Sequence, residues 1–145
     1  MQQEILDYIK SQPVGVLAVE MMDGSPHAAT VHFANSENPL IFFFETDRHY
    51  RKAEALLGRE VSRASFVIGT DESTMRTLQL DGEIRLLKDE EKQLFNDTYL
   101  GKFPKKVKKS EEPSTVFFVF IPKWWRFTDW TGPKGKIIIS SEDEA

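Results

Sequence analysis

Residues 14–45 of the chain, VGVLAVEMMDGSPHAATVHFANSENPLIFFFE, decide its fold. Three runs in this stretch are rich in β-branched and aromatic residues, which favour strands: 14–20, 26–34 and 40–45. Asp23-Gly24 in the first connection is typical of a hairpin turn, and the second connection, 35–39, is polar. Both connections are too short for a crossover between parallel strands. The stretch therefore predicts an antiparallel meander.

Strand patterns continue beyond the meander and alternate with short helical patterns. We expect further strands at residues 61–69, 75–87, 115–121, 124–130 and, at a sheet edge, 136–140. We expect helices at residues 3–11, 48–57 and 89–100, and a loop at 101–113. A closed or split barrel hides strand edges better than an open sheet does. The predicted fold is therefore mostly β with minor α, an antiparallel split β-barrel of six to eight strands with short helices.

Local signals refine the element boundaries. Asp81-Gly82 lies inside a predicted strand and indicates a bulge or a tight bend. Gly58 follows a helical stripe and is a natural C-cap. Thr46 and Asp47 are the candidates to cap the start of the same helix. Residues 141–145, SEDEA, form an acidic tail that we expect to fray.

Bulk composition narrows the class of protein. The 145 residues fit a single domain over 1–145, and a net charge of −4 gives no support to nucleic-acid binding. The absence of cysteine excludes disulfides, thiolate metal sites and a cysteine nucleophile. The N-terminal MQQEILDYIK has no signal-peptide character, and no apolar run is long enough to span a bilayer. We therefore expect a cytoplasmic protein that binds neither nucleic acid nor membrane.

Residues 44–53, FETDRHYRKA, carry the strongest signal for chemistry. A strand gives way to a helix that opens with the cations Arg48, Arg51 and Lys52. Cations in a first helical turn oppose the helix dipole, so their position suggests an anionic ligand at the free amides. Arg51 offers a forked contact and Lys52 a point charge, which suits a phosphate monoester, and Thr46 adds a hydroxyl donor. The same cations can equally form a solvated helix face.

The order of these elements resembles the pyridoxamine 5′-phosphate oxidase-like FMN-binding split-barrel family. The resemblance runs from about residue 14 to about residue 131 and rests on three motifs: the Asp-Gly-x-Pro hairpin, the strand–Thr–turn–Arg-Lys-Ala–helix segment and the late Asp-Gly strand. It implies that the FMN phosphate binds Arg51, Lys52 and Thr46. It also implies that the isoalloxazine ring lies along the second strand, at Ala29, Thr30, Val31 and His32. The resemblance further implies that the ring contacts Thr77, five positions before the late glycine Gly82.

The resemblance implies an FMN-dependent oxidoreductase that acts on an unidentified small molecule, with NAD(P)H a candidate partner and the flavin held between the subunits of a homodimer. The oxidase itself has an arginine, a lysine and a tyrosine where this chain has Ala29, Ala34 and Glu45. The resemblance is therefore to a short relative with another substrate. Two alternatives stay open. One is a protein that binds, stores or senses flavin or a haem-related or deazaflavin cofactor without turnover, and the other is a barrel that has lost its site.

Other chemistry-bearing residues admit simpler interpretations, and no catalytic side chain is named. His27 and His32 lie five apart on one strand and face opposite sides, so no metal site is expected. The tryptophans suit a core, an interface or a wall against a planar ring: Trp124, Trp125 and Trp130. A basic cluster can attract an anionic substrate or form a solvated loop balanced by Glu111 and Glu112: Lys102, Lys105, Lys106, Lys108 and Lys109.

Overall fold

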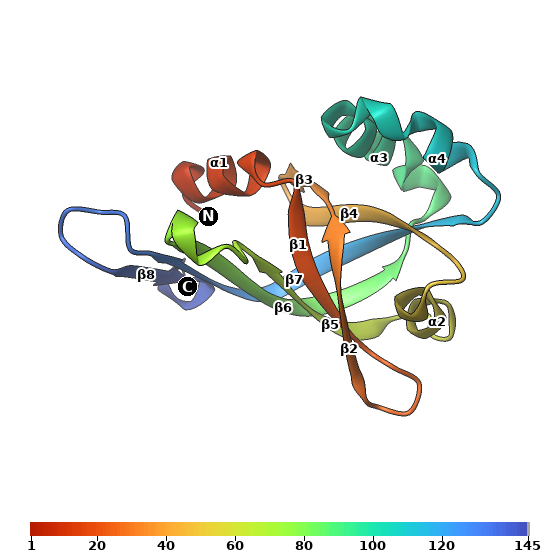
Figure 1. Cartoon of the computed structure of the whole chain (residues 1–145), viewed down its shortest axis with the longest axis horizontal. Helices are drawn as coiled ribbons and strands as arrows, with labels where there is room; N and C mark the ends of the chain where they lie inside the picture. The colour runs from red at the N-terminus through yellow and green to blue at the C-terminus, as the bar shows by residue number, and fades with distance from the viewer. Residues whose placement is uncertain (145) are drawn as a thin grey trace.

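The computed structural model describes residues 1–144, which form one antiparallel sheet curled into a split barrel (Figure 1). The strands are β1 (Val14–Glu20), β2 (Pro26–His32), β3 (Ala34–Glu37), β4 (Leu40–Asp47), β5 (Ser62–Ile68), β6 (Arg76–Leu86), β7 (Thr115–Asp129) and β8 (Ile137–Ser140). Their order is β2-β1-β5-β6-β7-β4-β3, and β8 pairs with β7 beyond the reach of β4. The predicted mostly β split barrel is confirmed.

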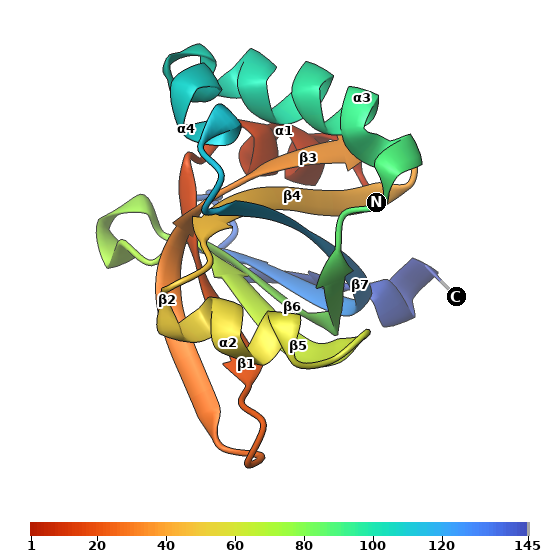
Figure 2. The ribbon, with the colours of Figure 1, turned by 90° about the vertical axis from the view of Figure 1, so that its right-hand side faces the viewer.

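Four short α-helices lie around the barrel within residues 1–144: α1 (Gln3–Ser11), α2 (Arg51–Leu57), α3 (Lys92–Phe95) and α4 (Val107–Glu111). α3 continues into a π-helical turn at Asn96–Leu100. The chain also has short 3-10 turns at Glu72–Thr74, Asp89–Glu91, Pro104–Lys106 and Ser141–Glu144. Figure 2 shows α3 and α4 as a layer over β3 and β4, with α2 on the opposite side of the barrel. Of the helices described, none has the length and apolar character that a membrane crossing requires.

Side chains of β4 alternate between the barrel interior and the helical layer. Phe42 points inward, where its ring centroid lies 5.4 Å from that of Phe66. Phe43 points outward and meets Phe95 of α3 at 6.0 Å. All four rings are buried, and each contributes about 1.5–3 kcal/mol to folding. Because every second strand residue shares a face, Thr46 lies on the interior face with Phe42.

One predicted strand boundary disappears in the structure. The strands expected at 115–121 and 124–130 form a single strand, β7, of 15 residues. β7 continues through Pro122 because its ladder with β6 is irregular there, and a missing N–H is tolerated at such a point. The bulge predicted at Asp81-Gly82 is confirmed at the same irregularity. A Cβ at Gly82 would collide with the backbone of β7, so only glycine fits.

Two other segments also differ from the prediction. The polar connection expected at 35–39 is mostly strand, since Ala34–Glu37 pairs with β4 as β3. The loop expected at 101–113 contains the helical turns Pro104–Lys106 and Val107–Glu111. The first segment is held by its pairing with β4, and the second by the hydrogen bond from Ser110 to Glu45 of β4, contacts that local propensity does not contain.

The expected frayed tail, 141–145, is ordered as far as Glu144. Ser141–Glu144 forms a 3-10 turn, and Glu144 Oε1 lies 2.7 Å from the N-terminal amine of Met1. This ion pair joins the two ends of the described chain. Ala145 lies outside the described residues.

Candidate functional site

The corner between β4 and α2 gathers the three predicted phosphate ligands, Thr46, Arg51 and Lys52. Thr46 is 4% exposed, and its hydroxyl has no hydrogen-bond partner within residues 1–144. Lys52 is 8% exposed, whereas Arg51 is exposed to solvent. A buried hydroxyl without a hydrogen bond costs about 1–3 kcal/mol. A ligand that brings an acceptor to this corner would recover that cost.

No ion pair balances the charge of Lys52 within the described residues 1–144. Among residues 1–144, no carboxylate lies within 4.0 Å of the cationic groups of Arg51 and Lys52. Burial lowers the pKa of Lys52 from its ordinary value. Its ammonium lies 4.8 Å from the ring centroid of Tyr50, the nearest compensation. Because a buried cation without a partner is costly, the corner suits an anion.

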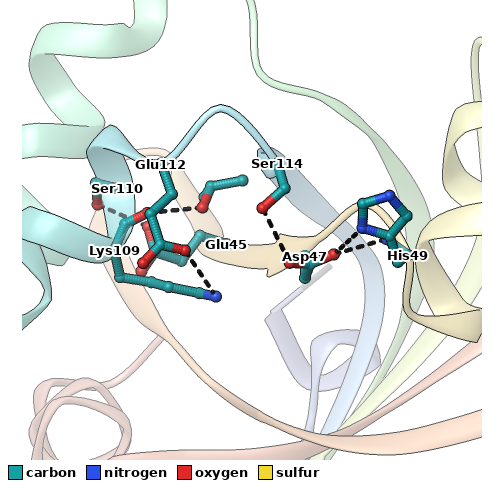
Figure 3. Close-up of polar contacts among 8 residues, drawn as sticks. Glu45, Asp47, His49, Lys109, Ser110, Glu112 and Ser114 are labelled. Atoms are coloured by element: carbon teal, nitrogen blue, oxygen red, sulfur yellow. Dashed lines mark hydrogen bonds and ion pairs between the residues drawn. The ribbon is translucent and has the colours of Figure 1, made fainter.

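Asp47 holds the turn between β4 and α2 through hydrogen bonds (Figure 3). Its carboxylate accepts hydrogen bonds from the backbone N–H of His49 at 2.8 Å and from the Ser114 hydroxyl at 3.0 Å. The Nδ1 atom of His49 lies 2.8 Å from the same carboxylate. These contacts, the backbone hydrogen bond foremost, lower the pKa of Asp47 to about 2. The carboxylate is therefore occupied by the turn and leaves the phosphate ligands free.

The expected N-cap of α2 is wrong, and its expected C-cap, Gly58, is confirmed. The N-cap is Tyr50, without a side-chain cap, and neither Thr46 nor Asp47 takes that role. Gly58 is the C-cap, but its φ of −80° is open to any residue. A Cβ there would lie 2.6 Å from the sulfur of Met22, an exposed and flexible side chain that can move aside. Because α2 has only seven residues, the side chains of this corner, and not the helix dipole, favour an anion.

β2 carries the four residues expected beside a planar ring. It pairs on one side only, with β1, so its other edge is open. Thr30 and His32 are exposed and Ala29 is half-buried, but the Val31 side chain is buried in the core. Val31 can therefore meet a ligand only through its backbone. Within the described chain, no group of three His, Asp or Glu side chains could hold a metal ion.

Thr77 lies apart from the phosphate corner. It is on β6, level with Ile68 and Gly15, whereas α2 packs near Met22 beyond the other end of β1. Seven residues of β1 separate the two levels, which is about 20 Å at about 3.3 Å per residue. Thr77 instead lines a cavity of about 840 Å³ with Arg76 and Trp130.

Two contacts at the corner could not be found from local sequence. Ser114 and Asp47 are 67 positions apart, and Ser110 and Glu45 are 65 apart. The resemblance aligned Glu45 with a tyrosine next to the phosphate threonine. The structure turns Glu45 to the helical layer, where its carboxylate accepts a 2.6 Å hydrogen bond from Ser110. Only the pairing of β4 with β7 brings these segments together.

Comparison with models of protein families shows which family the chain belongs to. The family model described as pyridoxamine 5′-phosphate oxidase matches residues 1–129. The chain belongs to the pyridoxamine 5′-phosphate oxidase family. A comparison with curated protein sequences gives no match. Membership of this family agrees with the resemblance drawn from the hairpin, the Arg51-Lys52 helix and the late Asp-Gly strand.

Solved structures of other family-like proteins share the fold at low sequence identity. A haem-binding protein from Mycobacterium smegmatis has a TM-score of 0.73 and 16% identity, over 94% of this chain and 57% of that one. A protein related to general stress protein 26, from Clostridium acetobutylicum, has a TM-score of 0.68 and 16% identity, over 99% and 96%. The haem storage protein HutZ from Vibrio cholerae has a TM-score of 0.69 and 14% identity, over 84% and 89%. At this level of identity the likeness shows a shared fold.

Proposed function

We propose that the chain binds FMN and acts as a flavin-dependent oxidoreductase on a small molecule. The observation that carries this proposal is the phosphate corner, where, within residues 1–144, Lys52 is buried without a carboxylate within 4.0 Å and the buried Thr46 hydroxyl has no hydrogen-bond partner. A phosphate monoester supplies both the negative charge and the acceptor atoms that these groups lack. Exposed Arg51 adds a forked contact from the solvent side.

Small side chains on β2 support a planar ring next to this corner. Ala28 and Thr30 are exposed there, and Ala29 is half-buried, so a ring can approach the backbone closely. The open edge of β2 offers unpaired N–H and C=O groups to the polar rim of such a ring. FMN, when bound, supplies hydride and electron transfer, and the protein holds and orients it.

A second copy of the chain accounts for the distance between the corner and Thr77. The outer face of β1 and β5 is not fully buried at Val14, Val16 and Val67. A twofold dimer through this face would cover those side chains. It would also bring the Thr77 and Trp130 cavity of one protomer toward the phosphate corner of its partner. The proposal therefore includes a homodimer with the flavin between subunits.

The phosphate corner is tested by the double substitution Arg51→Ala with Lys52→Ala. We expect FMN affinity, measured by quenching of flavin fluorescence, to fall by about 3–6 kcal/mol, since each charge-assisted hydrogen bond contributes about 1.5–3 kcal/mol. Lys105→Ala with Lys108→Ala is the matched control, because both lysines are exposed and neither forms an ion pair within residues 1–144. Equal affinity in the two double variants would refute the phosphate site. Bleaching of bound FMN by NADH or NADPH tests turnover separately.

Haem binding without turnover is the second candidate. His32 favours it, because its imidazole is open to a ligand while partial desolvation of the ring, and then the charges of Lys106 and Lys102, lower its pKa. A neutral imidazole is a common haem ligand, and two structurally similar proteins bind or store haem. A Soret band that His32→Ala abolishes, without any flavin binding, would favour this function over the flavoenzyme.

A further inference from the structure

A cavity of about 430 Å³ lies between α1, β3 and the π-helical turn that follows α3. β3 packs against both neighbours, and Figure 1 shows α1 next to it. Cavities of this size are typical of sites for small ligands. The residues that line it include none from β2 and none from the phosphate corner. An inference about this cavity therefore does not depend on the flavin proposal.

The charged side chains that line the cavity comprise two of each sign: Lys10, Lys102, Glu37 and Asp97. Within residues 1–144, none of them lies within 4.0 Å of an opposite charge. Neutral groups hold two of them in place. Lys102 donates a 2.5 Å hydrogen bond to the carbonyl oxygen of Gln12, and Asp97 accepts one of 2.9 Å from the side-chain amide of Gln93. The cavity thus keeps its positive and negative groups apart.

Lys102 is the charged group of this set that most needs a partner. It is partly buried, and the other three charged side chains are exposed. Burial lowers its pKa to about 8. The ring centroid of Phe33, 4.2 Å from its ammonium, offers partial compensation. An ammonium has three N–H donors, and the bond to Gln12 uses one of them. A carboxylate brought by a ligand would supply both a further acceptor and the opposite charge.

The helical wall of the cavity has two features that the fold does not require. π-helical turns are rare and are frequent at functional sites, and this one places Asp97 and Thr98 in the wall. Gly101 follows with a helical φ of −64° and ψ of −40°, a conformation in which alanine is more stable than glycine. Within the described chain, a Cβ at Gly101 would meet no atom of another element within 4 Å. The glycine therefore leaves this wall open.

We propose that this cavity binds a small free α-amino acid in its zwitterionic form. The carboxylate of the amino acid lies toward Lys10 and Lys102, and its ammonium lies toward Glu37 and Asp97. A simple anion would be attracted by the lysines but repelled by the carboxylates, and a simple cation would meet the reverse. Only a ligand that carries both charges gains from both sets. The open wall at Gly101 lets such a ligand approach the backbone closely.

The site is tested by nuclear magnetic resonance on isotope-labelled protein with three probes at constant ionic strength: L-alanine, propionate and ethylamine. Propionate lacks the ammonium of alanine, and ethylamine lacks its carboxylate. We expect saturable shifts of the Asp97 and Gly101 amide signals with L-alanine. The affinity for each of the other two should be lower by about tenfold or more, the loss of one charged contact. No saturable shift with L-alanine, or equal affinity for all three probes, would overturn the amino-acid site.

Charge variants test the two halves of the ligand separately. Glu37→Gln with Asp97→Asn removes the negative set and should abolish the preference for L-alanine over propionate. Glu60→Gln with Glu111→Gln is the matched control, because both carboxylates are exposed and form no ion pair within residues 1–144. The control should keep the preference. An equal loss in the two double variants would count against the site.

Gly101→Leu tests the cavity itself, since a side chain there extends into open space from a helical backbone. We expect L-alanine binding to be lost while the midpoint of urea unfolding does not fall. Unchanged binding in this folded variant would contradict the assignment. If the leucine unfolds the chain, the exposed Glu37 and Asp97 carry the test. None of these measurements reads FMN, so failure of the amino-acid site leaves the flavin proposal standing.

Discussion

Thr46 and Thr115 are both buried at the β4–β7 ladder, but only the hydroxyl of Thr115 is hydrogen-bonded within the described residues. The Thr115 hydroxyl donates a 2.6 Å hydrogen bond to the carbonyl oxygen of Lys109. The Thr46 hydroxyl, just across the same ladder, has no partner among the described residues. An unsatisfied buried group is a cost that folding alone does not explain. Binding sites often keep such costs because the ligand, not the fold, satisfies the group.

Thr46→Val should therefore raise stability while lowering affinity. Removal of the unsatisfied hydroxyl is expected to increase the free energy of unfolding of the ligand-free protein by about 1 kcal/mol and to weaken FMN about tenfold. Thr115→Val, the matched control, should lose about 1 kcal/mol of stability without changing FMN affinity. Urea unfolding and fluorescence titration measure the two effects. A Thr46→Val protein that is less stable and binds FMN unchanged would contradict the assignment.

At the scale of elements, the segment after α4 holds the β4–α2 turn in place. Ser114 bonds to the turn twice, through its hydroxyl to Asp47 and through its carbonyl oxygen, which accepts from the backbone N–H of Arg48 at 2.8 Å. Ser110 adds the hydrogen bond to Glu45 (Figure 3). The turn that presents the phosphate ligands is therefore clamped by residues of another element, which limits its loss of entropy on binding.

The Asp47 contacts make part of the stability depend on pH. A carboxyl whose folded pKa is about 2, below the ordinary 3.8, stabilises the fold above pH 3.8 and loses this contribution as the pH falls toward 2. Asp47→Asn should lower the melting temperature at pH 7, and its difference from the parent should shrink between about pH 4 and pH 2. Glu60→Gln, an exposed side chain, is the control and should shift neither value. Thermal melts across this pH range provide the measurement, and a difference independent of pH would count against the clamp.

At the scale of the whole molecule, the barrel is covered unevenly. α3 and α4 lie over β3 and β4, and α2 closes the other side (Figure 2). The outward side chains Val16 of β1 and Val67 of β5 are only partly buried, and they face each other across the ladder. A partly exposed apolar sheet face of this sort is typical of an interface.

Val67→Asp should therefore convert a dimer into a monomer. We expect light scattering after size-exclusion chromatography to give twice the 16.7 kDa chain mass for the parent and the single mass for the variant, because a charge would be buried unpaired in the interface. FMN affinity should fall together with dimerisation. Val107→Asp, exposed on α4 in the opposite layer, is the control and should stay dimeric. A parent protein of single mass would refute the dimer.

Much of the fold and part of the candidate site could be predicted from local pattern. Period-two alternation and the Asp23-Gly24 turn predicted the meander, and Asp81-Gly82 predicted the bulge. Arg51 and Lys52 stood out because their charges oppose a helix start. The continuity of β7 and the strand character of Ala34–Glu37 escaped prediction, since backbone pairing across the sheet overrides the turn signals of Pro122 and of the polar residues.

The sequence by itself determined which side chains are available: a β-rich chain without cysteine, with a cation pair where a strand meets a helix. Only the tertiary structure decided which of those charges stay unbalanced. Within residues 1–144, Lys52 is buried with no carboxylate within 4.0 Å, Lys109 pairs with Glu112, and Lys102 donates a hydrogen bond to the carbonyl oxygen of Gln12, 90 positions away. The physical reason is that the cost of a charge depends on its burial and its nearest partner. Both are set by contacts between segments that local propensity does not encode.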